Sequence, residues 1–101
     1  MIIEVATITV KPDTHSDFEA AVVKATDVFK QAKGCQGLQL HRSIEDPDIY
    51  QLHIVWDTLE NHTVDFREGA LFPQWRELVS PFFVSPPSVV HLSAATKRFS
   101  F

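Results

Sequence analysis

The sequence has little cysteine, no long apolar run and no basic cluster, and each absence excludes a class of protein. The one cysteine among 101 residues cannot form an internal disulfide, so a reducing cytoplasm is the expected compartment. No apolar run approaches the ~18 residues that a membrane-spanning helix needs. Nine Lys and Arg against 13 Asp and Glu give a net charge of −4 with no basic cluster, which argues against a nucleic-acid partner.

Several motifs with well-understood chemistry are also missing. The N-terminal stretch MIIEVATITV has no basic region ahead of its apolar residues, so we do not expect a signal peptide. The chain contains no GxGxxG, P-loop, CxxC, HExxH or GxSxG pattern, and nothing therefore indicates a bound nucleotide, a structural zinc ion or a serine hydrolase. With 45% hydrophobic and 22% charged residues, the chain is predicted to form one globular domain.

The first half of the chain shows clear periodicity. Residues 2 to 10 are rich in Ile, Val and Thr and predict a strand. Two alternating runs at 38–44 and 50–56 flank the turn sequence EDPD and predict a hairpin. Between the first strand and the hairpin, five apolar residues step by 4, 3, 4 and 3 and predict a helix that ends at Gly34: Phe18, Val22, Ala25, Phe29 and Ala32.

The register of the hairpin follows from matching its apolar faces. Pairing Ile44 with Tyr50 keeps the apolar residues of both strands on one side of the sheet. The same register sets His41 directly opposite His53 on the other side.

The second half predicts two shorter helical segments and a final strand. Asp57 or Thr58 is expected to cap the first segment, and Gly69 to interrupt it. Residues 88 to 95 predict the last strand, followed by an extension or a frayed tail. The apolar sides of the helical segments carry Leu59, His62 and Phe66, and then Phe72, Trp75 and Val79.

The resulting order β-α-β-β-α-β is typical of the ferredoxin-like α+β fold, an antiparallel sheet with both helices on one face. The helix-free face would then carry Val55 and the set Ile3, Val5 and Thr7 among polar and histidine side chains. Such a face is too apolar for water and too polar for a dry core. We therefore predict a homodimer whose sheets pack face to face.

Residues 34–66 read GCQGLQLHRSIEDPDIYQLHIVWDTLENHTVDF, residues 71–83 read LFPQWRELVSPFF and residues 86–92 read PPSVVHL. With their GCxG turn, a hairpin that ends in Trp and Asp, and a helical histidine, these stretches resemble the antibiotic biosynthesis monooxygenase (ABM) domain. The resemblance covers residues 2 to 94 of one domain at 1–101, with a tail at 95–101. It implies a dimeric α/β barrel formed by two such sheets.

Members of this family include cofactor-independent oxygenases of phenols and quinols, haem-degrading enzymes and isomerases. The haem-degrading branch uses an asparagine in the first strand, where this chain has Ala6 and Thr7, and a helical tryptophan, where it has Asp65 or Phe66. The polyketide-tailoring branch pairs a helical asparagine with a tryptophan one turn later, whereas Asn61 is followed by Asp65. Haem is thus not expected, and the resemblance leaves the oxygenase chemistry open.

A cofactor-free oxygenase needs a base that deprotonates a phenol and an apolar cavity that holds the anion beside dioxygen. His62 is the leading candidate for this base, because helical spacing points it inward with Leu59 and Phe66. Asp65 could orient His62, or could instead lie on a solvated helix face or pair with Arg67 or Arg76.

The candidate pocket consists of aromatic and histidine side chains. Phe66, Phe72 and Trp75 could form a wall for a planar substrate, or could be plain core. His91 could project into the same cavity or line the dimer seam. Glu4 could be its neighbour, because the first and last strands are adjacent in this fold, although a solvated strand end is the default for this glutamate.

His41 and His53 are expected to make polar contacts across the dimer seam, since two histidines without a third ligand are weak grounds for a metal site. The sequence thus predicts a cytoplasmic homodimer that oxidises a small phenolic or quinol-like compound with dioxygen and without metal or flavin. The alternatives are a cyclase or isomerase that uses the same cavity and a non-catalytic dimer that binds a ligand.

Overall fold

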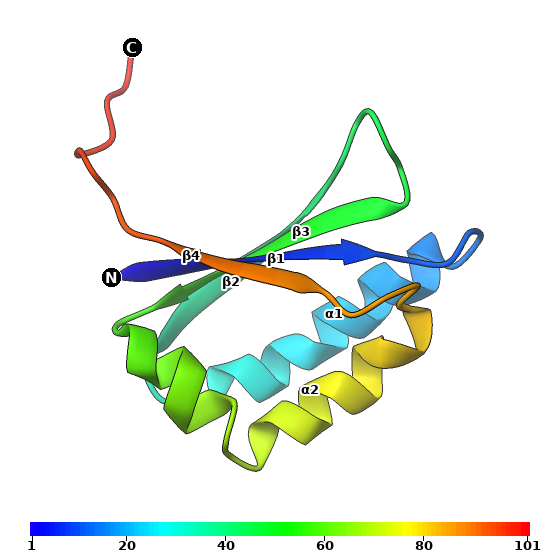
Figure 1. Ribbon diagram of the computed structural model, residues 1–101, viewed down its shortest axis with the longest axis horizontal. Helices are drawn as coiled ribbons and strands as arrows, with labels where there is room; N and C mark the ends of the chain where they lie inside the picture. The colour runs from blue at the N-terminus through cyan, green and yellow to red at the C-terminus, as the bar shows by residue number, and fades with distance from the viewer.

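A four-stranded antiparallel sheet with its helices on one face makes up the body of the protein, as the computed structural model of residues 1–101 shows (Figure 1). The strands lie in the order β2-β3-β1-β4, so the first and last strands are neighbours as predicted. The ferredoxin-like α+β fold is therefore confirmed. Its elements are β1 (Ile2–Thr9), α1 (His15–Lys30), β2 (Cys35–Arg42), β3 (Ile49–Trp56), η1 (Asn61–Phe66), α2 (Leu71–Val79), η2 (Ser80–Phe82) and β4 (Ser88–Leu92).

The core lies between the sheet and the two α-helices. The five apolar residues of the predicted helical stripe are all buried, which confirms that α1 packs this face on the sheet. From β3, alternate residues enter the same core because successive strand side chains point to opposite faces. These β3 residues are Tyr50, Leu52, Ile54 and Trp56, all almost completely buried.

The predicted hairpin register is wrong by two residues. Arg42, rather than Ile44, pairs with Tyr50, and His41 lies opposite Gln51. The reason is a wider loop: β2 ends at Arg42, and the Arg42 Nε–H donates to the Pro47 carbonyl across the turn. Ile44 consequently lies on this loop and is 90% exposed. A shift of two residues preserves which side chains share a face, so the predicted faces are correct.

The chain between β3 and α2 forms a short π-helix. The Thr58 hydroxyl accepts a hydrogen bond from the Asn61 N–H at 3.1 Å, which confirms Thr58 as the predicted cap. The Arg67 N–H then donates to the His62 carbonyl at 3.0 Å, the five-residue step of a π-helix. This winding brings residues five apart onto one side, so Asn61 and Phe66 both face inward next to His62, whereas Leu59 stays partly exposed.

The helix-free face is a mixed apolar and polar surface. Ile3, Val5 and Val55 lie there, as the register of β1 with its neighbours requires. β4 is shorter than predicted, but it adds Val90 and Leu92, which are 53% and 52% exposed. Residues 93–101 have no regular structure and project away from the sheet (Figure 1). None of the helices combines the length and apolar character that crossing a bilayer demands.

Candidate active site

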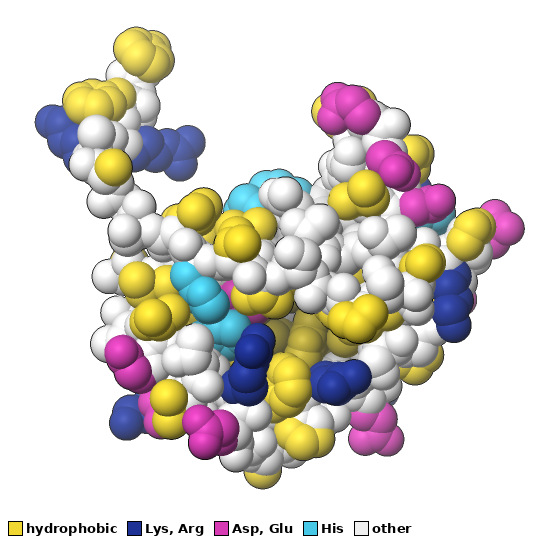
Figure 2. Space-filling model, viewed as in Figure 1, with side chains coloured by type: hydrophobic (Ala, Val, Ile, Leu, Met, Phe, Trp, Pro, Cys, Tyr) yellow, Lys and Arg dark blue, Asp and Glu magenta, His cyan; other side chains and the backbone are white.

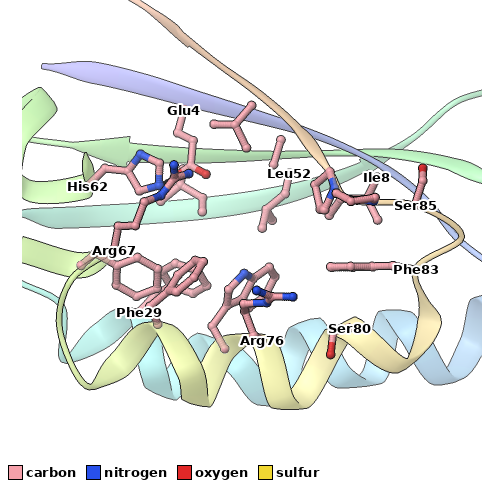
Figure 3. Close-up of a pocket in the computed structure, with 18 of the residues that line it drawn as sticks. Glu4, Ile8, Phe29, Leu52, His62, Arg67, Arg76, Ser80, Phe83 and Ser85 are labelled. Atoms are coloured by element: carbon pink, nitrogen blue, oxygen red, sulfur yellow. Dashed lines mark ion pairs between the residues drawn. The ribbon is translucent and has the colours of Figure 1, made fainter. Parts of the chain in front are cut away.

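A cavity of about 660 Å³ lies between the sheet and α2. Figure 2 looks into it: hydrophobic side chains form the floor, and histidine and basic side chains lie at the rim. Figure 3 shows that the lining comes from both layers, with Glu4, Ile8 and Leu52 above and Phe29 and Arg76 below. A volume of this size suits a small organic ligand.

Glu4 reaches this cavity from β1. Its side chain points to the helix-bearing face, in phase with Ala6 and Ile8, and is almost fully buried. The Trp56 Nε1–H donates to Glu4 Oε1 at 3.0 Å. No protein group bonds to Oε2, and no fully buried side-chain polar atom lacks a partner, so this second oxygen is open to the cavity.

His62 connects Glu4 to the surface. Its Nε2 lies 3.2 Å from Glu4 Oε1, and its Nδ1 lies 2.8 Å from Nε2 of His91. The imidazole also stacks on the Trp56 ring with centroids 5.4 Å apart, which fixes its plane. Because Glu4 and His91 are paired across β1 and β4, strand register places both groups within reach of η1. The result is a continuous chain of three titratable side chains.

Burial shifts the pKa values of the inner pair toward their neutral forms. Burial raises the pKa of Glu4 from 4.5 to about 7, against a smaller opposing effect of the Trp56 hydrogen bond. Burial also lowers the pKa of His62 from 6.5 to about 4, assisted by His91 and Arg67. At neutral pH, His62 is therefore uncharged and Glu4 is near its midpoint, where a carboxyl can both accept and release a proton.

The histidine pair allows a proton to pass in either direction. With Glu4 ionised, a proton on His62 Nε2 faces the carboxylate 3.2 Å away, and Nδ1 accepts a hydrogen bond from His91. In the other tautomer of His62, Nε2 carries no proton and the Nδ1–H donates to His91. The hydrogen bond between the two histidines can thus run in either direction, and His91 is half-exposed at its outer end.

The GCxG turn holds η1 in place. Gly34 adopts a φ of +77°, a conformation that favours glycine. Its missing side chain leaves room for Asn61, whose amide would collide with a Cβ at this position. Asn61 Oδ1 in turn accepts the Thr58 N–H, and the Gly34 carbonyl accepts the Asp57 N–H at 2.8 Å. The turn and the start of η1 therefore fix the position of His62.

Aromatic side chains form one wall of the cavity. Phe66, Phe72 and Trp75 all line the cavity. Phe29 stacks on Phe66 with centroids 5.1 Å apart and meets Trp75 edge-on at 5.0 Å. These rings form one side of the cavity, against which a planar ligand can pack.

Two predicted site residues lie elsewhere than expected. Asp65 does not touch His62, because its carboxylate accepts from Asn61 Nδ2 at 3.1 Å and lies 4.0 Å from Lys33 rather than pairing with Arg67 or Arg76. His91 contacts His62 but is not among the lining residues of the cavity. Glu4 takes the place expected of Asp65.

Glu4 lines the cavity, although the sequence predicts a solvated strand end for it. The expected solvated strand end is wrong, since Trp56 and His62 cover this carboxyl. The alternation of Glu4 with Ala6 and Ile8, both core residues, was the available signal that Glu4 faces inward.

His41 and His53 lie on the helix-free face with ring centroids 4.6 Å apart, diagonal rather than directly opposite. Burial, aided by the nearby His41, lowers the pKa of His53. The structure contains no group of three His, Cys, Asp or Glu side chains arranged to hold a metal ion.

Comparisons with known proteins agree with this fold. The uncharacterized protein YczJ of Bacillus subtilis is 31% identical over 91 residues, which are 90% of this chain and 96% of YczJ. The structure of an antibiotic biosynthesis monooxygenase family protein from Bordetella bronchiseptica is 47% identical, with a TM-score of 0.92 over 94% of this chain and 97% of that one. The monooxygenase from the gene ActVA-Orf6 of Streptomyces coelicolor, solved with nanaomycin D, superimposes with a TM-score of 0.80 at 21% identity, over 99% of this chain and 92% of that one.

The sequence profile described as "Antibiotic biosynthesis monooxygenase" matches residues 1–78, which include Glu4, His62 and the whole aromatic wall. The chain belongs to the antibiotic biosynthesis monooxygenase family.

Proposed function

We propose that this protein is a cofactor-independent monooxygenase that oxidises a small phenolic or quinol-like aromatic compound. The observation that carries the proposal is the row of close contacts from Glu4 through His62 to His91 at the end of an aromatic cavity. It supplies two elements that the chemistry requires, a proton acceptor that titrates near neutrality and a mainly apolar space for the anion.

The overall reaction takes a phenol with a free para C–H and dioxygen to a quinone and water. Glu4 removes the hydroxyl proton, and the electron pair of the anion forms a bond from the para carbon to oxygen. The terminal oxygen of the resulting peroxide takes up the proton. Cleavage of the O–O bond with loss of the ring hydrogen then releases water and leaves the second carbonyl. The ring is oxidised by four electrons and dioxygen is reduced by four, so no external reductant is needed.

In this scheme His62 and His91 work as a proton path rather than as the base itself. His62 is neutral at working pH, because burial keeps its pKa near 4. It can therefore relay the proton held on Glu4 to half-exposed His91, and solvent can restore the ionised carboxylate for the next turnover.

A cyclase or isomerase would use the same acid–base chain without dioxygen, and a binding protein would need neither. An open cavity that reaches a carboxyl with a pKa of about 7 favours catalysis over binding alone. The S. coelicolor monooxygenase, which holds nanaomycin D, supports a small-molecule ligand in this fold.

The test is oxygen uptake with a panel of phenols and 1-naphthols that have a free para C–H, without added metal or flavin. We expect Glu4→Gln, which keeps the acceptor for Trp56 but cannot take a proton, to lower kcat/KM at least about a hundredfold. Glu19→Gln is the matched control, because Glu19 accepts from the Tyr50 hydroxyl and does not line the cavity. Conversion without uptake of labelled dioxygen would identify a cyclase or isomerase, and no conversion of any compound would favour the binding function.

We further infer that the protein works as a homodimer in the cytoplasm. The exposed side chains of Val90 and Leu92, beside His41 and His53, form a face that a second copy can cover by twofold symmetry. The single free cysteine, Cys35, fits a reducing compartment. Cell fractionation that places the protein outside the cytoplasm would refute the location.

A further inference from the structure

Two arginines stand at the cavity without a partner. Arg67, which follows η1, and Arg76, in the last turn of α2, both line the otherwise mainly apolar cavity. Their guanidinium carbons lie 5.9 and 6.0 Å from the ring centroid of Phe72, so both cations are next to the same aromatic side chain. Arg42 is the only arginine in an ion pair or a side-chain hydrogen bond.

The cavity is consequently positive although the protein as a whole is negative. The only acidic lining residue is Glu4, which is near its midpoint at neutral pH, and His62 is uncharged there. Two unpaired guanidinium groups therefore dominate the local charge in a chain with a net charge of −4. A concave site of one sign with apolar walls attracts ligands of the opposite sign.

The cavity has acid–base side chains on one side and an arginine on the other. Glu4 and His62 lie on the sheet side of the cavity, whereas Arg76 rises from the helix side (Figure 3). Arginine binds carboxylates through paired, charge-assisted hydrogen bonds, and the rings between the two regions accept a flat apolar body. A ligand that fits the acid–base pair, the aromatic rings and the arginine side of the cavity is an aromatic acid with a hydroxyl group at one end and a carboxylate at the other.

We propose that the substrate is an aromatic carboxylic acid whose carboxylate is bound by Arg67 and Arg76 while its phenolic hydroxyl faces Glu4. This inference rests on the proposed function for the role of the hydroxyl, but the recognition of the carboxylate stands on the two arginines alone. Glu4, Arg67 and Arg76 all line one cavity of about 660 Å³, so a single small molecule can reach all three side chains.

The test is calorimetric binding under argon with two probes, 6-hydroxy-2-naphthoic acid and its neutral methyl ester. The wild-type protein is expected to bind the acid about tenfold more tightly than the ester. Added salt should weaken the binding of the acid and leave the binding of the ester unchanged. Arg67→Gln/Arg76→Gln should remove this preference while leaving ester binding unchanged. Arg98→Gln, on the exposed tail outside the cavity, is the matched control and should keep the preference.

An acid preference that persists in the double variant would overturn the inference, and so would equal affinity for acid and ester or no binding of either. Because no oxygen is present, these results are independent of catalysis. Arginine-dependent binding of the acid without any oxygen uptake would retain the carboxylate site and refute the oxygenase. Oxygen uptake with neutral phenols, together with an acid preference that persists in the double variant, would retain the oxygenase and refute the carboxylate site.

Discussion

Glu4 Oε1 lies 3.2 Å from His62 Nε2, although one residue comes from the first strand and the other from the π-helix after the hairpin. Both groups are nearly excluded from solvent, and burial favours the neutral form of each. The contact thus joins a carboxyl that is easily protonated to an imidazole that is difficult to protonate, and this difference supports Glu4 as the proposed proton acceptor.

The raised pKa of Glu4 predicts a stability change with pH. A carboxyl whose pKa rises from 4.5 to about 7 on folding binds more protons in the folded state between these values, so its contribution is lost as the pH rises through this window. Glu4→Gln has no charge to bury. Its free energy of unfolding should therefore increase relative to the wild type by about 3 kcal/mol between pH 4.5 and pH 8.

Urea denaturation at several pH values measures this difference. His62 acts in the opposite sense, because its pKa falls to about 4 and its contribution is lost as the pH falls below 6.5. The comparison of Glu4→Gln with the wild type isolates the glutamate, since both proteins retain His62. If the difference in free energy of unfolding between the two proteins stays constant across this pH range, then ionisation of Glu4 does not destabilise the folded state.

Trp56 is expected to tune the pH dependence of catalysis. Its Nε1–H donates to Glu4 and favours the ionised carboxylate. Trp56→Phe removes this donor, so the pKa of Glu4 should rise further and the ascending limb of kcat/KM should move to higher pH. Trp75→Phe, which changes the cavity wall without touching Glu4, should alter KM and leave the midpoint in place. Identical pH profiles for wild type and Trp56→Phe would contradict this role.

Gly34 is expected to be required for the position of η1. Gly34→Ala adds a Cβ that meets the Asn61 side chain and also strains a φ of +77°. We expect a loss of about 3 kcal/mol in the free energy of unfolding, together with lower activity. Gly37→Ala is the comparison, because its Cβ has nothing within 4 Å and only backbone strain of about 1 kcal/mol remains. Equal losses in both variants would remove the proposed role of the contact between Gly34 and Asn61.

The helix-free face is expected to form the dimer interface. Val90→Lys places an ammonium group on this face and should weaken association about a hundredfold or more, because burying an unpaired charge is costly. Val23→Lys, on an exposed position of α1 that is 70% accessible, should leave the dimer intact. Sedimentation velocity distinguishes these cases, and a wild-type protein that sediments as a monomer would refute the interface.

Much of this fold could be predicted from the sequence, because the buried residues of a helix or strand recur at regular spacings. The stripe of α1 and the alternation in β3 confine apolar residues to one side, and the structure buries both sets. The inward direction of His62 was predictable for the same reason. The adjacency of first and last strands, inferred from the order of elements, also brought Glu4 and His91 together correctly.

The remaining features depend on contacts that local patterns do not record. The observed hairpin register differs from the predicted one because Arg42 donates a hydrogen bond to the Pro47 carbonyl and so closes a wider loop. Matching the apolar faces of the two strands does not predict this bond. The burial of Glu4 depends on Trp56 and His62, which are distant in sequence and cover its carboxyl. Asp65 lies near His62 in sequence, yet the π-helical turn directs its carboxylate to Asn61.

The most direct measurement is an infrared titration of the Glu4 carboxyl. The difference spectrum between the wild type and Glu4→Gln isolates the carbonyl band of this protonated side chain, which disappears as the group ionises. A midpoint at about pH 7 is predicted, since the buried carboxyl holds its proton well above the ordinary value of 4.5. A midpoint at or below 4.5 would show a permanently ionised Glu4 at working pH and would contradict its role as the proton acceptor.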